Sequence, residues 1–233
     1  MTLRQKSAGT TGSLSKQDYC TPDDFLAVVA PRFGPISFDL AAHAGNKKHE
    51  RYFAPPEFHF VLPADDLTWD HVVMDAARMM AGYNNIDEVN AGIFEAEEKG
   101  DKVHVTVENG DPNAVALDSL KQDWHKLEGL LWLNCEFKDI SPWAEKCGEE
   151  AAQGAHVLLL TPAQVGANWY RDHIAGLADV FFLNGRLSFD GKNPFPKDCM
   201  LSYYYPEASG TQYVWDWKSN KVLHRWKYDG FST

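Results

Sequence analysis

Long hydrophobic runs are missing from this sequence. No segment approaches the roughly 18 to 20 consecutive apolar residues that a membrane-spanning helix needs. The first sixteen residues, MTLRQKSAGTTGSLSK, contain no apolar stretch of the kind found in signal peptides. We therefore expect a soluble, cytoplasmic protein with no membrane partner.

Cysteine is also scarce. The four cysteines, Cys20, Cys135, Cys147 and Cys199, are widely spaced and form no C-x-x-C pair. This spacing indicates neither a zinc site nor a disulfide framework. We expect reduced thiols and no bound metal.

Basic residues are few relative to acidic ones. The 22 Lys and Arg residues face 33 Asp and Glu residues, which gives a net charge of −11 and argues against a nucleic-acid binder with a basic surface throughout. The acidity is local, however, because residues 57–128 contain 16 acidic and 5 basic residues. The rest of the chain is neutral overall, so that part can still present a positive face to DNA.

What the sequence does contain is apolar segments in alternation with helical patterns. Hydrophobic residues make up 44% of the 233 residues, enough for a packed core. Short buried strands are predicted at 36–40, 130–133, 155–160, 179–183 and 200–205. Helices are predicted at 22–33, with Thr21 as the cap and Pro22 as the first helical residue, and at 141–153 and 163–176. This alternation predicts an α/β fold with a parallel sheet covered by helices on both sides. A hairpin predicted at 213–228 would extend the sheet in antiparallel fashion.

Three regions of different composition divide the chain. Residues 1–17 are rich in Ser, Thr, Gly and Lys and predict a flexible leader. Residues 18–56 and 129–233 carry the α/β pattern, which predicts a core in two segments. The acidic residues 57–128 break the pattern with a predicted helix at 70–81 and an alternating strand at 103–107, so we expect an α+β insertion.

Two loops follow predicted strands at the positions where ligands bind in open α/β sheets, outside the carboxyl ends of the strands. The first loop, Asp39 to Asn46, combines an acidic residue with small residues that allow a ligand to approach the backbone. The second loop is Asn134-Cys135-Glu136-Phe137, which combines an amide, a thiol, a carboxylate and an aromatic ring.

The order of several short motifs resembles a known family. These motifs are Tyr19-Cys20-Thr21-Pro22-Asp23, Phe38-Asp39-Leu40-Ala41-Ala42 with Asn46 and Tyr52, Trp124, Trp132-Leu133-Asn134, Pro142-Trp143, Leu159-Leu160-Thr161-Pro162-Ala163 with Trp169-Tyr170, and Gly185-Arg186-Leu187-Ser188-Phe189. Together they resemble the phage-encoded DNA N-6-adenine methyltransferases of the Dam-like family, over roughly residues 18–56 and 117–205.

The resemblance implies a Rossmann-like fold, S-adenosylmethionine as cofactor and DNA as partner, in the host cytoplasm if a phage encodes the protein. It implies that the cofactor pocket is formed by Thr21, Pro22, Asp39, Ala41, Ala42 and Asn46. It also places Asn134, Cys135, Glu136 and Phe137 where the family has a catalytic Asn-Pro-Pro-Tyr loop. The loss of both prolines and of the tyrosine hydroxyl is a departure from the family pattern.

The chemistry of this loop leaves three functions open. Methylation of an exocyclic amine, most simply that of adenine, needs acceptors for the amine hydrogens, which Asn134 and the Cys135 carbonyl can supply, and an aromatic ring such as Phe137 to stack on a flipped base. Methylation of a pyrimidine at carbon 5 would instead use Cys135 as a nucleophile with a carboxylic acid such as Glu136 nearby. The third function is a non-catalytic protein that binds cofactor or DNA.

Substrate contacts are expected from basic and aromatic residues. Lys47 and Lys48 belong to a basic cluster that suits phosphate groups or, equally, a solvated loop. Arg186 suits a substrate or an internal carboxylate. Through the resemblance we also expect Trp169 and Tyr170 to contact substrate.

Overall fold

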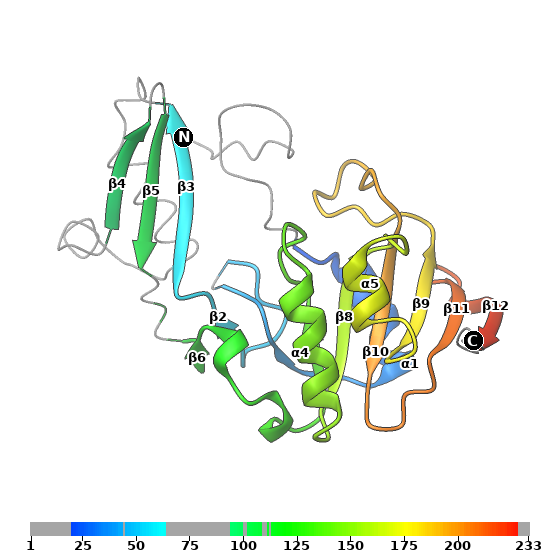
Figure 1. Cartoon of the computed structure of the whole chain (residues 1–233). Helices are drawn as coiled ribbons and strands as arrows, with labels where there is room; N and C mark the ends of the chain where they lie inside the picture. The colour runs from blue at the N-terminus through cyan, green and yellow to red at the C-terminus, as the bar shows by residue number, and fades with distance from the viewer. Residues whose placement is uncertain are drawn as a thin grey trace. The chain divides into compact units, whose positions relative to one another are not determined.

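The computed structural model describes residues 20–43, 45–63, 94–99, 102–108, 111 and 113–227 (Figure 1). The chain divides into two compact units. Of the described residues, the first unit contains those within Ala41–Lys47 and Arg51–Ser119, and the second contains 20–40, Lys48–Glu50 and 120–227. The expected leader and the helix predicted at 70–81 lie outside the described residues, and the proposed division into core and insertion stays a prediction.

A seven-stranded sheet forms the centre of the second unit. Its strands lie in the order β1-β7-β8-β10-β9-β11-β12. Their bounds are β1 Ile36–Asp39, β7 Leu130–Leu133, β8 His156–Pro162, β10 Cys199–Tyr204, β9 Asp179–Asn184, β11 Thr211–Asp216 and β12 Lys221–Lys227. Strands β1, β7 and β8 are parallel, as are β9 and β11, whereas β10 is antiparallel to β8 and β9. The α/β class is therefore confirmed, with a mixed sheet.

Helix α1 (Asp23–Phe33) covers one face of this sheet. Phe25 and Val29 are fully buried there among side chains of β7, β8, β9 and β11. The ring of Phe25 meets Trp132 edge-on at 6.4 Å and Trp217 at 5.4 Å between centroids. Burial of such large rings is a main source of stability, and it fixes the N-terminus of α1 near the carboxyl end of β7.

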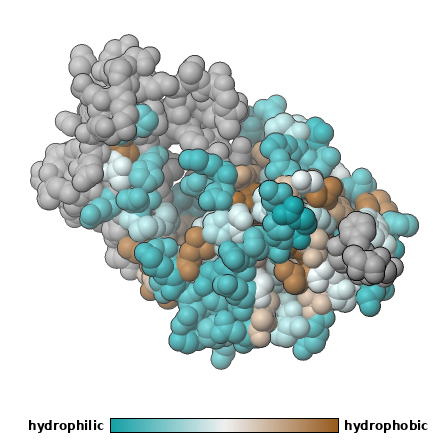
Figure 2. All heavy atoms as spheres, in the orientation of Figure 1, coloured by the Kyte–Doolittle hydropathy of each residue, from teal (hydrophilic) through white to brown (hydrophobic). Residues whose placement is uncertain are grey.

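Helices α4 (Ser141–Ala151) and α5 (Asn168–His173) cover the opposite face (Figure 1). Side chains alternate along a strand, so the residues of β7 and β8 that do not face α1 face these helices. Cys147 and Ala144 of α4 are fully buried, and Tyr204 of β10 donates from its hydroxyl to the His173 carbonyl at 2.8 Å. The outer surface over α4 and α5 is mostly hydrophilic (Figure 2).

The first unit contains short strands. Strands β2 (Phe53–Ala54) and β6 (Ala116–Leu117) pair in parallel, and β3 (Glu57–Pro63), β5 (Lys102–Glu108) and β4 (Phe94–Lys99) form an antiparallel sheet with β5 in the middle. Strand β5 contains the predicted strand at 103–107, which is confirmed.

Three expectations for the sheet were wrong in detail. The sheet is not wholly parallel, because a strand buried on both faces has the same continuous apolar pattern in either direction. The hairpin of β11 and β12 forms, but β11 joins β9 in parallel. The helix predicted at 163–176 is confined to six residues, because its first part instead forms turns, in which Gln164 donates to the Pro162 carbonyl and Ala167 to the Gln164 carbonyl.

The segment that connects β10 to β11 passes close to the residues at the start of β9; we call this segment the crossing. Gly210 has φ +68°, and a side chain there would lie 2.9 Å from Cα of Gly176. Asp179, the first residue of β9, accepts hydrogen bonds from the Ser209 and Thr211 backbone N–H groups and from the Tyr205 hydroxyl. A buried carboxylate thus holds this crossing in place.

Among the described residues, none of the helices combines the length and apolar character needed to cross a bilayer.

Candidate active site

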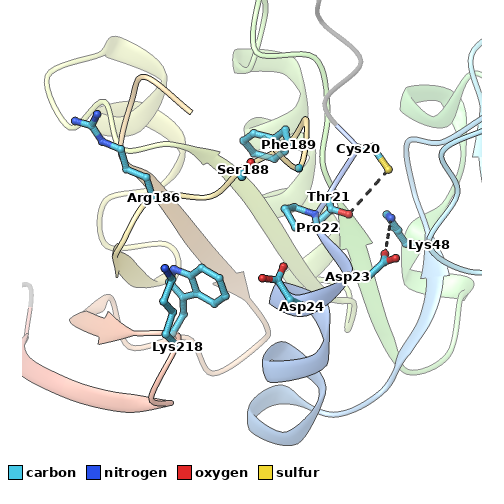
Figure 3. A pocket seen from close by; sticks show the side chains of 12 residues that line it. Cys20, Thr21, Pro22, Asp23, Asp24, Lys48, Arg186, Ser188, Phe189 and Lys218 are labelled. Carbon is cyan, nitrogen blue, oxygen red and sulfur yellow. Dashed lines mark hydrogen bonds and ion pairs between the residues drawn. The ribbon is translucent and has the colours of Figure 1, made fainter. Parts of the chain in front are cut away.

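A pocket of about 460 Å³ lies at the N-terminus of α1 in the second unit (Figure 3). This volume is in the range typical of small-molecule sites. Four chain segments form it, namely the residues that lead into and begin α1, Lys48, the segment after β9, and the turn between β11 and β12. The lining residues are Cys20, Thr21, Pro22, Asp23, Asp24, Lys48, Arg186, Ser188, Phe189, Gly191, Trp217 and Lys218.

Pro22 and Thr21 determine how the chain enters the pocket. Pro22 is the N-cap of α1, with φ −63° and ψ 137°, and the helix begins at Asp23. We expected Thr21 as the cap and Pro22 as the first helical residue, so the start of the helix differs by one position. The Thr21 side chain makes no capping bond; it is buried, and its Oγ1 accepts a hydrogen bond from Asn134 Nδ2 at 3.0 Å.

The four side chains of the loop after β7, Asn134–Phe137, differ in their contacts and exposure. Asn134 contacts Thr21 of the pocket, and the ring of Phe137 meets the pocket residue Phe189 edge-on at 6.1 Å. Phe195 packs against both phenylalanine rings. The first and last residues of the loop therefore both touch the lining of the pocket, whereas Glu136 is exposed.

Cys135 is buried away from solvent, with 3% of its surface exposed. Burial raises the pKa of its thiol far above the ordinary value, and nearby acidic residues add to the effect. Its electrostatic neighbours include Cys147 of α4 and Tyr204 of β10, whose own pKa values are likewise raised by burial. Because the thiolate is the nucleophilic form, this environment does not favour attack by Cys135.

Lys48 connects the pocket to the end of β1. Its Nζ donates to Asp23 Oδ1 at 2.8 Å, and its backbone N–H donates to Asp39 Oδ2 at 2.9 Å. Burial lowers the pKa of Lys48, but its contacts with Asp23 and Cys20 outweigh this effect and leave the pKa above the ordinary value. Lys48 therefore carries a positive charge at neutral pH, next to Asp23 of α1.

The remaining residues expected at the cofactor lie in the first unit, together with Lys47. Ala42 donates from its backbone N–H to the Phe53 carbonyl, and Asn46 accepts at Oδ1 from the His43 backbone N–H at 2.8 Å. The Lys47 ammonium lies 5.3 Å from the centre of the Tyr52 ring. These contacts hold the Ala41–Lys47 loop within its own unit.

Arg186 is at the opposite side of the pocket from Lys48 (Figure 3). Its Nε donates to Asp198 Oδ1 at 3.1 Å, so it has an internal carboxylate partner and also lines the pocket. Within the described chain, Trp169 and Tyr170 of α5 are not among the lining residues; Tyr170 is buried, and its ring meets that of Trp169 edge-on.

Several pocket residues were missed by the sequence reasoning. Phe189 was predicted only as part of the Gly185–Phe189 motif, with no role at a site. Trp217 and Lys218 belong to the C-terminal hairpin, which was expected only to extend the sheet. Trp217 donates from Nε1 to the Gly185 carbonyl at 2.9 Å, which holds the hairpin turn against the Arg186 segment. No local pattern reveals such a contact between distant segments.

One group of side chains has the composition of a metal site. Asp123, His125 and Glu150 lie close enough to share an ion. However, Glu150 already accepts from Lys146 Nζ and from His125, and Asp123 pairs with Lys126. These contacts give the group a structural role that joins the 3₁₀ turn η3 (Trp124–Lys126) to α4.

Comparison with known proteins adds a single finding. The model of the family described as DNA N-6-adenine-methyltransferase (Dam) matches residues 113–199. No curated protein and no solved structure matches the chain. The matched stretch is just over a third of the chain and contains the Asn134–Phe137 loop, α4, β8, α5, β9 and Arg186. This part of the protein is thus similar to an adenine methyltransferase of DNA.

Proposed function

We propose that this protein is an S-adenosylmethionine-dependent DNA methyltransferase that transfers a methyl group to the exocyclic amine of adenine. The observation that carries the proposal is the arrangement of the loop after β7. Asn134 and Phe137 contact residues that line the pocket, while Cys135 is buried and Glu136 is exposed. These are the two residues that we propose for amine methylation at this loop, and both positions lie within the stretch that the family model matches.

The pocket has the chemistry to hold the proposed cofactor. The methionine part of S-adenosylmethionine carries an ammonium and a carboxylate group, which need partners of opposite charge. Asp23 and Asp24 offer carboxylates and Lys48 offers an ammonium in the same pocket. Thr21 and Pro22 line the same pocket, and the Asp39 carboxylate accepts from the backbone N–H of Lys48 and so positions this residue. Lys48 is already bonded to Asp23, but an ammonium has three N–H donors and can also donate to a ligand carboxylate, and Asp24 remains for the ligand ammonium. The donor set therefore fits this group, which supplies an electrophilic methyl bound to a sulfonium sulfur.

Asn134 would prepare the amine of the target base. The hydrogen bond from Nδ2 to Thr21 fixes the orientation of the amide, and its Oδ1 has two lone pairs with which it can accept an amine hydrogen. The Cys135 carbonyl is the proposed second acceptor. With both hydrogens directed to acceptors, the nitrogen lone pair points away from the ring plane, and Phe137 stacks on the base.

The same observations weigh against transfer to carbon 5 of a pyrimidine. That reaction needs an accessible thiolate, and the burial of Cys135 disfavours both access and ionisation. Instead of acting as a nucleophile, Cys135 can anchor the loop, as the two prolines of the family loop would do. We propose that the buried Cys135 supplies by packing the rigidity that the prolines would supply through their fixed φ.

DNA would be the partner, and the cytoplasm of the host cell would be the place of action, because both substrates are available there. If a phage encodes the protein, its targets would be phage or host DNA.

The decisive experiment is mass spectrometry of nucleosides after incubation of the protein with unmethylated DNA and methyl-labelled cofactor. We expect N6-methyladenine from the wild type, severely reduced amounts from Asn134→Ala, and only modestly reduced amounts from Cys135→Ala, which loosens the packing of the loop but keeps the backbone acceptor. If 5-methylcytosine forms instead and Cys135→Ala abolishes it, the carbon-5 reaction is correct. Cofactor binding by calorimetry without transfer to any DNA would show a non-catalytic protein.

A further inference from the structure

Strand β12 forms an exposed basic edge of the sheet. It is the last strand in the sheet order, and all seven of its residues are exposed. Residues 217–227, WKSNKVLHRWK, contain four Lys and Arg residues and no acidic residue. We call the set of Lys218, Lys221, Arg225, Trp226 and Lys227 the β12 strip.

Aromatic contacts hold two side chains of the strip in place. Trp226 is 37% exposed and stacks on Phe182 of β9 at 6.0 Å. The Arg225 guanidinium lies 5.6 Å from the centre of the Tyr213 ring, which in turn stacks on Phe181. Arg225 and Trp226 are successive residues of the strand and lie on opposite faces of the sheet, so the strip is held from both sides. The Arg225 charge therefore needs less ordering when a partner binds.

The strip begins at the pocket itself. Lys218 lines the pocket beside Arg186, and the neighbouring Trp217 is bonded to the Gly185 carbonyl. From Lys218 the chain turns into β12, which is the edge strand of the sheet (Figure 1). Lys218 of the pocket lining is thus followed along the chain by the cations of this edge strand. Strand β12 has the length of about 20 Å, which corresponds to roughly six phosphates along one strand of B-DNA.

We propose that the β12 strip binds the phosphate backbone of duplex DNA next to the target base. The proposal rests on the proposed function, because it gives the DNA substrate of that reaction a docking surface. A second copy of the chain is a poor occupant, since two β12 edges would place cations against cations. Lysines on edge strands also prevent unwanted pairing, but that role does not require the strip to begin at a pocket.

The test compares two double variants with equal changes in charge. Lys221→Gln with Lys227→Gln alters the strip, and Lys121→Gln with Lys126→Gln alters exposed lysines elsewhere in the second unit. Binding of a fluorescent duplex of about 20 base pairs is measured by anisotropy between about 50 and 200 mM salt, where each lost phosphate contact lowers the log–log slope by about 0.9. Thermal unfolding checks that both variants are folded.

We expect the strip variant to lower the slope by about 1.8 and the control to leave it unchanged. Equal slopes in the wild type and the strip variant would overturn the proposal, even if the wild type methylates adenine. If the wild type methylates no DNA, the proposed function fails separately. If the strip variant loses affinity for polyglutamate but retains its slope with DNA, the partner is an acidic polypeptide and the proposal is wrong.

Discussion

Asn134 donates from Nδ2 to Oγ1 of Thr21 over 3.0 Å, although 113 positions separate the two residues in the sequence. This bond joins the loop after β7 to the entrance of α1, two segments that each belong to the proposed chemistry. It makes Thr21 a positioning residue for the amide as well as a lining residue of the pocket.

We predict that Asn134→Ala lowers kcat for adenine methylation by about 10²-fold or more, because a preorganised polar contact to the reacting group is lost. Thr21→Val should lower kcat by about fivefold, which corresponds to the free energy of about one hydrogen bond. Thr21→Ser keeps the hydroxyl and should have a kcat near that of the wild type. Single-turnover transfer of labelled methyl groups measures both effects.

The combination of the two changes supplies a control. If Thr21 acts through Asn134, Thr21→Val should cost little more in the Asn134→Ala background. An unchanged kcat in Thr21→Val alone would show that the bond does not position the amide.

Cys135 should resist alkylation in the native protein. Its burial keeps reagents out and raises the pKa of the thiol, whereas Cys20 is half-buried and lines the pocket. After treatment with iodoacetamide at pH 8, peptide mass spectrometry should find Cys20 modified and Cys135 intact. In urea both thiols should react. Rapid native labelling of Cys135 would reopen its role as a nucleophile.

Glu150 should make stability depend on pH. Burial raises the pKa of Glu150, but the bonds from Lys146 and His125 outweigh it, so the folded-state pKa lies below the ordinary 4.5. A depressed carboxyl pKa stabilises the fold above the unfolded value, and this contribution is lost as pH falls through the folded value. We predict that Glu150→Gln lowers the free energy of unfolding by about 2 kcal/mol at pH 7.

Urea unfolding at a series of pH values checks this expectation, with the exposed neighbour Glu149→Gln as the matched control. The gap between wild type and Glu150→Gln should shrink as the pH falls below 4.5. A gap independent of pH would mean that the carboxylate charge does not matter.

Local signals in the sequence predicted α1 well. Acidic residues after Pro22 and the stop at Gly34 fixed its bounds to within a residue. The direction of β10 was not predictable, because its register against β8 and β9 depends on a crossing that no apolar pattern encodes. The loop at Asn134 was found from its position after a buried strand.

The far side of the pocket could not be predicted for a similar reason. Trp217 and Lys218 are separated from Thr21 by most of the sequence. The ring contact of Trp217 with Phe25 and its hydrogen bond to the Gly185 carbonyl bring them to the pocket. Hydrophobic periodicity identifies elements and their buried faces, but it contains no information on which distant segments meet.

The crossing from β10 to β11 should depend on Asp179. This buried carboxylate accepts from the Ser209 and Thr211 backbone and from Tyr205, so its removal takes away all three bonds and leaves the N–H of the buried Thr211 without this acceptor. We predict that Asp179→Ala lowers the free energy of unfolding by about 2 to 4 kcal/mol, and Tyr205→Phe by about 1 kcal/mol. The exposed Asp139→Ala should change it by less than about 0.5 kcal/mol. Urea unfolding measures all three, and equal stability of Asp179→Ala and Asp139→Ala would show that the crossing is held by Gly210 and the packing of β11 alone.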